Sequence, residues 1–134
     1  MTLLLRGLTC SPSRSGVPGG LPNSSADWDA IAEVPARALF TTGRGVDPSA
    51  LGAIPANVHV EAFVPQRDVL PRVNAVVCHG GSGTVLGALA AGVPLVVAPI
   101  GADQPHNAQR IAAVGAGLAV PNPGPSMLRA AIER

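Results

Sequence analysis

The stretch that decides the fold is residues 75–98, AVVCHGGSGTVLGALAAGVPLVVA. It opens with a continuous apolar run of strand length, passes through a cluster of glycines, and continues as an apolar helix from Thr84 to Ala91. Gly92 stands where a glycine commonly follows the last turn of a helix, and residues 95–98 read as a second apolar strand. The stretch therefore predicts a fully buried strand–helix–strand unit.

Outward from this unit, helices and strands alternate along the chain from Asp27 onward. Further helices are predicted at residues 27–34, 67–73, 105–114 and from Ser126, and further strands at 38–42, 58–63 and 117–120. This alternation is typical of the α/β class, a doubly wound, Rossmann-like parallel sheet with helices on both faces. Such sheets bind ligands outside the carboxyl ends of their strands. Four residues directly follow predicted strands and are expected along that edge: Gly43, Gln66, His79 and Asp103.

Residues 1–25 differ from the rest, because proline, glycine and serine dominate from Ser11 to Ser25. A tract of this composition buries too little apolar surface to offset the entropy lost on ordering, so we expect it to be poorly ordered, with at most a short strand at residues 2–5. Residues 26–134 are then the single ligand-binding domain, as the length of 134 residues also suggests.

The composition argues against several classes of function. Aromatic residues make up 2% and the formal net charge is +1, which gives neither a stacking platform nor a basic stripe for nucleic acid. The charge-free run from Val73 to Ala102 is interrupted by His79, glycines and prolines, so it does not predict a membrane helix, and we expect a cytoplasmic protein. The three histidines and two cysteines match no metal-ligand spacing, so no metal is expected.

The segment His79-Gly80-Gly81-Ser82-Gly83-Thr84 leaves a strand and opens a helix. Glycines let the backbone approach a ligand closely, and the N–H groups of a helix N-terminus attract anions. His79, Ser82 and Thr84 add side-chain donors. The segment, called the cradle below, is therefore suited to a diphosphate, although a tight turn whose glycines serve packing is the alternative explanation.

Three other chemistries fit the cradle less well. A P-loop requires lysine after its last glycine, and this chain has no lysine. A nucleophile elbow would need glycine at position 84. The dinucleotide-binding fingerprint is matched in part by Gly81, Gly83, Gly87 and Asp103. In that fingerprint the acidic residue ends the next strand, whereas here it lies beyond it, so a dinucleotide-binding oxidoreductase fragment is the less favoured alternative.

Four blocks occur in order along the chain: Phe63-Val64-Pro65-Gln66, then the cradle, then Gly92-Val93-Pro94, then Pro99 with Asp103-Gln104. Together they resemble the donor-binding signature of family 1 glycosyltransferases, most closely the bacterial branch that glycosylates macrolides and other antibiotic aglycones. The resemblance covers about residues 35–134. It implies the C-terminal, nucleotide-sugar-binding domain of the two-domain GT-B fold.

The resemblance also implies a ligand and roles for individual residues. The donor would be a UDP- or TDP-sugar, with no cofactor. Contacts to the base and ribose would come from Phe63, Val64 and Gln66. Contacts to the diphosphate would come from His79, Gly81, Ser82, Gly83 and Thr84. Contacts to the sugar hydroxyls would come from Asp103 and Gln104, which otherwise read as a helix cap.

Two departures from the family limit what the resemblance implies. Plant members have a ribose-binding glutamate where this sequence has Gly87, so another group would have to bind the ribose. The general base of the family is a histidine of the N-terminal, acceptor-binding domain, so no catalytic residue is expected within these residues. We therefore expect nucleotide binding without turnover by this chain alone, and interpret it as a truncated or frame-shifted remnant or one member of a split pair.

The function expected of the complete enzyme is inverting transfer of a hexosyl group to a hydroxyl of a natural product. The missing or separate N-terminal half would then be the partner of this chain. A non-catalytic nucleotide-sugar-binding module, or an auxiliary partner of another transferase, is the alternative.

Overall fold

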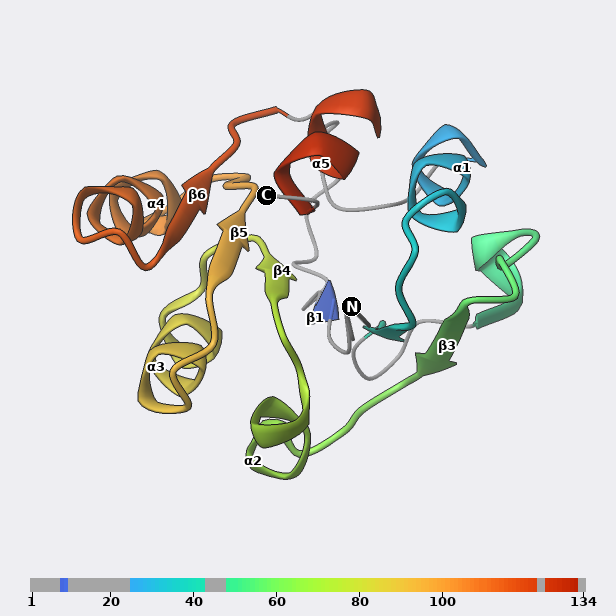
Figure 1. Cartoon of the computed structure of the whole chain (residues 1–134), viewed down its shortest axis with the longest axis horizontal. Coiled ribbons are helices and arrows are strands. Elements are labelled where there is room, and N and C mark those ends of the chain that lie inside the picture. The colour runs from blue at the N-terminus through green and yellow to red at the C-terminus, as the bar shows by residue number, and fades with distance from the viewer. Residues whose placement is uncertain (1–7, 10–24, 43–47, 123–124, 133–134) are drawn as a thin grey trace.

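The computed structural model describes residues 8–9, 25–42, 48–122 and 125–132. Within these ranges six strands form one parallel sheet in the order β3-β2-β1-β4-β5-β6 (Figure 1). The strands are β1 Leu8–Thr9, β2 Ala38–Thr41, β3 Val58–Glu61, β4 Val76–Cys78, β5 Leu95–Val97 and β6 Gly117–Ala119. The chain therefore winds outward in both directions from the neighbouring pair β1 and β4, as in Rossmann-type sheets.

Helices connect the strands. They are α1 Ser25–Ala32, α2 Gln66–Val69, α3 Ser82–Ala90, α4 Gln104–Ala113 and α5 Pro125–Ile132, with 3₁₀ turns η1 Pro48–Leu51 and η2 Leu70–Arg72. Pro105 lies in the first turn of α4, where its missing N–H leaves no hydrogen bond unmade. Gly92 follows α3 with φ +68°, a left-handed conformation that glycine adopts at little cost.

Two hydrophobic clusters lie on opposite faces of the sheet. Val77 and Val96 pack with residues of α1 and α5, whereas the neighbouring Val76 and Leu95 pack with residues of α3 and α4. Successive side chains of a strand point to opposite faces, which is why neighbours in sequence join different clusters. This arrangement confirms the predicted α/β, doubly wound class.

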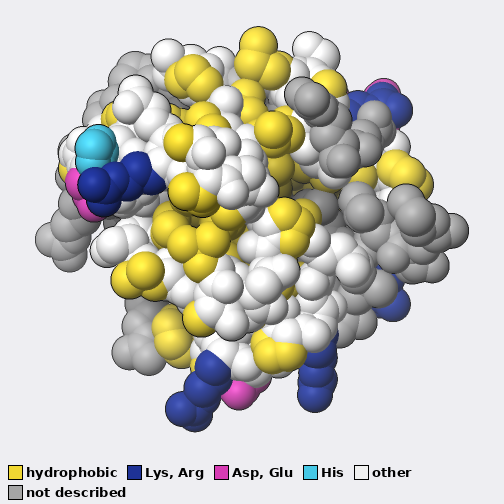
Figure 2. Space-filling view, turned by 60° about the vertical axis from the view of Figure 1, so that its left-hand side comes forward, with side chains coloured by type: hydrophobic (Ala, Val, Ile, Leu, Met, Phe, Trp, Pro, Cys, Tyr) yellow, Lys and Arg dark blue, Asp and Glu magenta, His cyan; other side chains and the backbone are white. Residues whose placement is uncertain are grey.

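The outer side of α3 departs from the prediction. Leu86 and Leu89 are exposed on α3, at 66% and 41%, so the unit at residues 75–98 is not fully buried. Figure 2 turns the side of the molecule that carries α3 and α4 forward and shows hydrophobic side chains in the middle of that face, with charged ones at its margin. The two strands of the unit are covered on both faces as expected.

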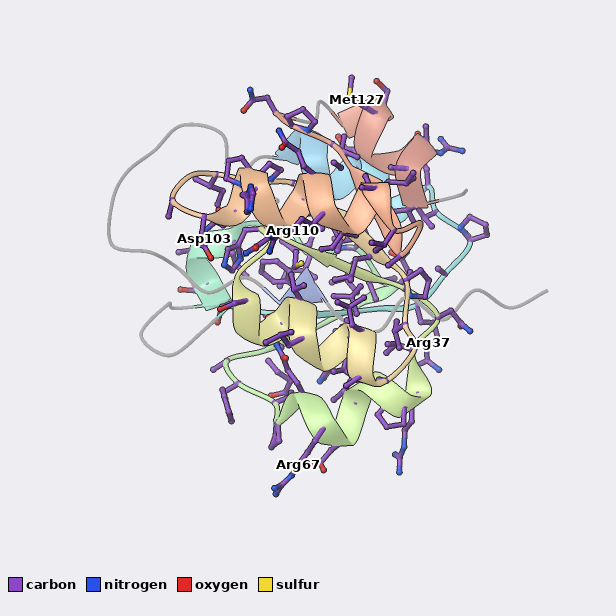
Figure 3. The ribbon with its side chains drawn as sticks, turned by 90° about the vertical axis from the view of Figure 1, so that its left-hand side faces the viewer. Arg37, Arg67, Asp103, Arg110 and Met127 are labelled. Atoms are coloured by element: carbon purple, nitrogen blue, oxygen red, sulfur yellow. The ribbon has the colours of Figure 1, made fainter. Side chains whose placement is uncertain are left out.

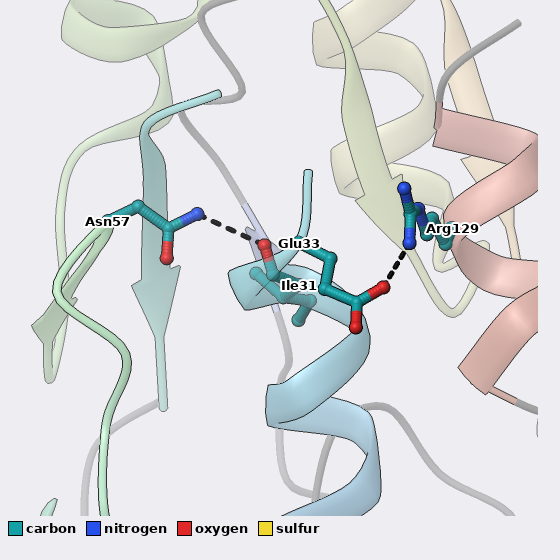
Figure 4. A network of polar contacts seen from close by, with 4 residues as sticks. All are labelled: Ile31, Glu33, Asn57 and Arg129. Atoms are coloured by element: carbon teal, nitrogen blue, oxygen red, sulfur yellow. Dashed lines mark hydrogen bonds and ion pairs between the residues drawn. The ribbon is translucent and has the colours of Figure 1, made fainter. Parts of the chain in front are cut away.

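Polar contacts hold α1 in place. The Asn57 side-chain amide donates to the carbonyl oxygen of Ile31 at 3.0 Å (Figure 4) and to that of Ala36 at 3.1 Å, which ties the start of β3 to the end of α1. An ion pair between Glu33 and Arg129 joins α1 to α5. Because the Glu33 side chain is 64% exposed and that of Arg129 39%, solvent screens the ion pair, and we expect the amide contacts to contribute more to stability.

The strand β1 was not predicted. Leu8 pairs with Phe40 of β2 and with Val77 of β4, so the centre of the sheet is formed by a tract expected to be poorly ordered. Two residues are too few to show an apolar period, and pairing on both sides decides their conformation. Residues 1–7 and 10–24 of that tract, with the possible strand at residues 2–5, and Gly43 lie outside the described residues, whereas Ser25 begins α1. In the described part of the chain, no helix has the length and apolar character that a bilayer span requires.

Candidate functional site

The cradle follows β4, at the point where the strand order reverses. β4 pairs with β1 on one side and β5 on the other, and His79 is the first residue after β4. Ligands of open parallel sheets bind outside the carboxyl ends of the strands at such a point. The loop after β5 leads to Asp103 at the start of α4, so the cradle and Asp103 lie at the same edge of the sheet.

Gly80 allows the cradle to lie close to β5 and α4. Its φ is +94°, and a Cβ there would meet Val97 Cγ1 at 2.7 Å and the carbonyl oxygen of Gln104 at 3.3 Å. A Cβ on Gly81 would meet His79 Nε2 at 2.7 Å, so the imidazole lies directly against Gly81. Among the described residues, no side chain caps the N-terminus of α3, and a Cβ on Gly83 would meet none of their atoms within 4 Å. The first turn of α3 therefore presents N–H groups and open space beside His79.

His79 carries an unsatisfied polar atom. Its Nδ1 is buried and has no hydrogen-bond partner among the described residues. Burial lowers the pKa of His79 from its ordinary value of 6.5, and the negative charge of Asp103 opposes this effect in part. The ring is thus mainly neutral at neutral pH. Because Nδ1 is buried, a ligand would meet the half-exposed ring elsewhere on its surface, and an anionic oxygen bound there would favour the charged ring.

Asp103 and Gln104 differ in what their side chains do. Gln104 Oε1 accepts hydrogen bonds from the N–H groups of Ile100 at 2.9 Å and Gly101 at 3.1 Å, which closes the loop after β5. Asp103 occupies the N-cap position of α4 but makes no side-chain cap, so the cap interpretation is wrong for Asp103. Its carboxylate is exposed and remains close enough to His79 to affect its pKa.

Asn107 is a residue of this site that the sequence analysis missed. Its side-chain nitrogen donates to the carbonyl oxygen of Gly80 at 3.0 Å and to Asp103 Oδ2 at 3.1 Å. The only signal in the sequence was its spacing from Asp103, because residues four apart meet on one side of a helix. The contact to Gly80 has no local signature.

Gln66 joins the first of the four sequence blocks to the cradle. Its Nε2 donates to Thr84 Oγ1 at 2.9 Å. A Cβ on Gly87 would lie 3.3 Å from Gln66 Oε1 and 3.2 Å from Leu70 Cδ1, so the Gln66 amide covers the position where plant relatives have glutamate. The predicted base and ribose group and the predicted diphosphate group are thus in direct contact through Gln66.

The remaining predicted residues are placed as follows. Phe63 is 57% exposed and lies with the half-buried Val64 on the loop between β3 and α2, so Phe63 is not a core residue. Ser82 is exposed at the first position of α3. Cys78 is fully buried, and burial raises the pKa of its thiol to about 11, so it is an unreactive packing residue. In the described ranges no three His, Cys, Asp or Glu side chains gather as metal ligands would.

Two cavities lie away from the cradle. One of about 350 Å³ is lined by Arg37, His59 and neighbouring residues where β2 and β3 begin, and Figure 3 shows Arg37 and Asp103 at opposite ends of the molecule. The other, of about 500 Å³, lies between α1 and the η1 turn. We place the site at the cradle, because parallel sheets bind ligands at the carboxyl ends of their strands and the donors converge there.

Comparisons with known proteins agree with this geometry. Residues 25–134 match the family described as erythromycin biosynthesis protein CIII-like, C-terminal domain. The chain is 48% identical over 89 residues to the elloramycin glycosyltransferase ElmGT of Streptomyces olivaceus, which covers 66% of this chain and 23% of that protein.

Solved structures agree as well. The glycosyltransferase SnogD from Streptomyces nogalater superposes with a TM-score of 0.77 at 31% identity, over 98% of this chain and 35% of that one. The glycosyltransferase VinC, solved in complex with DTDP, gives a TM-score of 0.74 at 28% identity, over 97% and 32%. The chain thus spans about a quarter to a third of the length of these relatives.

Proposed function

Because this chain belongs to the family of erythromycin biosynthesis protein CIII-like C-terminal domains, we propose that it binds the donor of a glycosyltransferase, a UDP- or TDP-sugar. The family membership confirms the resemblance that the four sequence blocks indicated. The solved relatives confirm the fold. The activity, donor and acceptor of this chain are proposals, since the relatives are about three times as long.

One observation carries the proposal: three predicted contact groups meet at one sheet edge. Gln66 contacts Thr84 of the cradle, and Asn107 links the cradle to Asp103. Base and ribose, diphosphate and sugar would then follow one another along this edge. The nucleotide in the VinC structure favours a thymidine diphosphate (dTDP) donor, and a site without a ribose-binding glutamate is consistent with a deoxyribose.

The proposed chemistry places the leaving group on α3. When a hexosyl group passes to an acceptor hydroxyl, negative charge grows on the departing diphosphate, and preorganised N–H donors at a helix N-terminus stabilise it. His79 donates to the same oxygens. In the proposed reaction the acceptor and the base that deprotonates it come from the second domain of the enzyme. A dinucleotide is disfavoured, because the cradle follows β4, whereas the dinucleotide fingerprint follows the first strand of its fold.

The proposal is tested by calorimetric titration of UDP and dTDP into the chain. Replacing His79 with alanine removes one hydrogen bond to an anion, and we expect about tenfold weaker binding of the preferred nucleotide. His59→Ala is the matched control, since His59 pairs with Glu61 on the surface of β3, away from the cradle, and should bind like the wild type. Equal affinity of the wild type and His79→Ala would remove the cradle from the proposal. Stabilisation by NAD rather than by dTDP would favour the dinucleotide alternative.

The pH dependence of binding gives a second test. Burial lowers the pKa of His79 in the free chain, and a bound diphosphate raises it again, so binding takes up a proton. We therefore expect the affinity for dTDP-glucose to rise as the pH falls from about 7.5 to about 5.5. A nucleotide sugar is the appropriate ligand, because its diphosphate carries constant charge over this range.

The stability of the ligand-free chain should change with pH in the opposite direction to the affinity, and fall as the pH falls. The unfolded chain protonates its histidine at a higher pH than the folded chain does, so His79 makes the folded state less stable as the pH falls through about 6.5. His79→Ala should flatten both profiles, whereas a slope that persists in this variant would assign the proton to another group.

A further inference from the structure

We propose that Asn107 is a positioning residue that couples the diphosphate part of the site to the sugar part, an inference that rests on the proposed function. Asn107 is half-buried in the first half of α4 and directs both hydrogens of one amide into the site. One goes to the carbonyl oxygen of Gly80 and the other to Asp103 Oδ2. One side chain therefore holds a backbone group of the cradle and a side chain predicted to bind sugar.

The contact to Gly80 fixes the orientation of a peptide plane. In a trans peptide the carbonyl and the following N–H point in opposite directions. Because the Gly80 carbonyl is held toward Asn107, the N–H of Gly81 points away from α4. Gly80 has φ +94°, a region that glycine leaves easily, so the plane needs such an anchor. Asn107 thereby presets a donor at the N-cap position of α3.

The contact to Asp103 fixes a carboxylate that solvent would otherwise leave free to rotate. Asp103 is exposed and makes no cap interaction with α4. With Oδ2 held by Asn107, Oδ1 can accept from a sugar hydroxyl in a defined direction. The same contact holds the negative charge of Asp103 near His79. The orientation of both ligand-binding groups thus depends on one amide.

A purely structural asparagine provides the comparison. Asn57 also donates from its side-chain amide to backbone carbonyl oxygens, those of Ile31 (Figure 4) and Ala36, but it lies before β3 and outside the site. Asn57→Ala should therefore lower the melting temperature and leave ligand binding unchanged. Asn107→Ala is expected to lower the melting temperature and also to weaken ligand binding. Asn107→Leu, which keeps about the shape of the side chain but has neither an N–H donor nor a charge, is the second variant.

The first measurement is the increment in affinity that the sugar provides, taken as the ratio of the dissociation constants of dTDP and dTDP-glucose. We expect Asn107→Ala to weaken dTDP-glucose binding about tenfold, and dTDP binding less, because dTDP does not use Asp103. In an Asp103→Ala background, Asn107→Ala should no longer change the ratio. Equal weakening of both ligands in both backgrounds would show a structural role only and overturn the proposal.

The second measurement needs no ligand. NMR titration of His79 should give a lower pKa in Asn107→Ala and Asn107→Leu than in the wild type, because the charge of Asp103 is no longer held near the ring. Asn57→Ala should leave the His79 pKa unchanged. If neither Asn107 variant moves it, Asn107 does not position Asp103, whether or not nucleotides bind. If the variants move it but the wild type binds no nucleotide, the proposed function fails and the positioning stands.

Discussion

Replacing Gly117 with alanine is expected to lower the free energy of unfolding by about 3 kcal/mol or more. Gly117 pairs with Leu95 across β5 and β6, and a Cβ there would lie 1.9 Å from the carbonyl oxygen and 2.7 Å from the carbonyl carbon of Leu95. Because these are backbone atoms, no side-chain rotation relieves the clash. β6 must therefore move away from β5 and disturb the contact of α4 with β6. Urea denaturation followed by circular dichroism measures the loss.

Gly101→Ala is the matched control. A Cβ on Gly101 would meet nothing within 4 Å, and its N–H, which donates to Gln104, is retained in alanine. Its effect on stability should stay within about 0.5 kcal/mol. Equal midpoints for the two variants would show that β6 can shift without cost, and would contradict the close approach of Gly117 to β5.

The fold could be predicted because its signals are local. The apolar runs at Val76–Cys78 and Leu95–Val97 have the length of strands, and each is followed within a few residues by glycine or proline. Glycine and proline end strands through their own backbone chemistry, so this signal does not depend on the rest of the fold. β1 could not be predicted, because Leu8 and Thr9 are strand residues only through their pairing with β2 and β4. Tertiary contact, not composition, decides that segment.

The location of the site could be predicted for the same reason, since a cradle between a strand and a helix is a local pattern. The hydrogen bonds within the site could not be predicted. The Gln66–Thr84 and Asn107–Gly80 hydrogen bonds join residues 18 and 27 positions apart, and many polar side chains along the chain could have made them. Asp103 illustrates the limit most clearly. Its position before a helix predicts a cap, yet its carboxylate turns to Asn107 instead.

The glycines also look alike in sequence and differ in the structure. Gly80 and Gly92 both adopt positive φ, at +94° and +68°, but only Gly80 has atoms in the place of a Cβ. Glycine is required at position 80 because β5 and α4 approach the backbone closely. At position 92 it is required only by the turn after α3. This difference allows the effect of steric exclusion in the cradle to be separated from that of backbone conformation.

Gly80→Ala should weaken nucleotide binding by about 100-fold. The new Cβ would lie 2.7 Å from Val97 Cγ1 and 3.3 Å from the Gln104 carbonyl oxygen, so the loop must move away from β5 and α4. That movement breaks the anchor to Asn107 and misdirects the N–H groups at the start of α3. Loss of two hydrogen bonds to an anion, at about 1.5 kcal/mol each, corresponds to this factor. Calorimetric titration with dTDP and dTDP-glucose measures it.

Gly92→Ala carries the same conformational cost without the clash, since a Cβ there would meet nothing within 4 Å. Both variants should lose about 1 kcal/mol of stability for an alanine held at positive φ. Only Gly80→Ala should lose more than that and also lose affinity, because only its Cβ displaces the cradle. If Gly80→Ala binds dTDP as tightly as Gly92→Ala does, the backbone of the cradle is not what holds the diphosphate, and the donor site must lie elsewhere on the sheet edge.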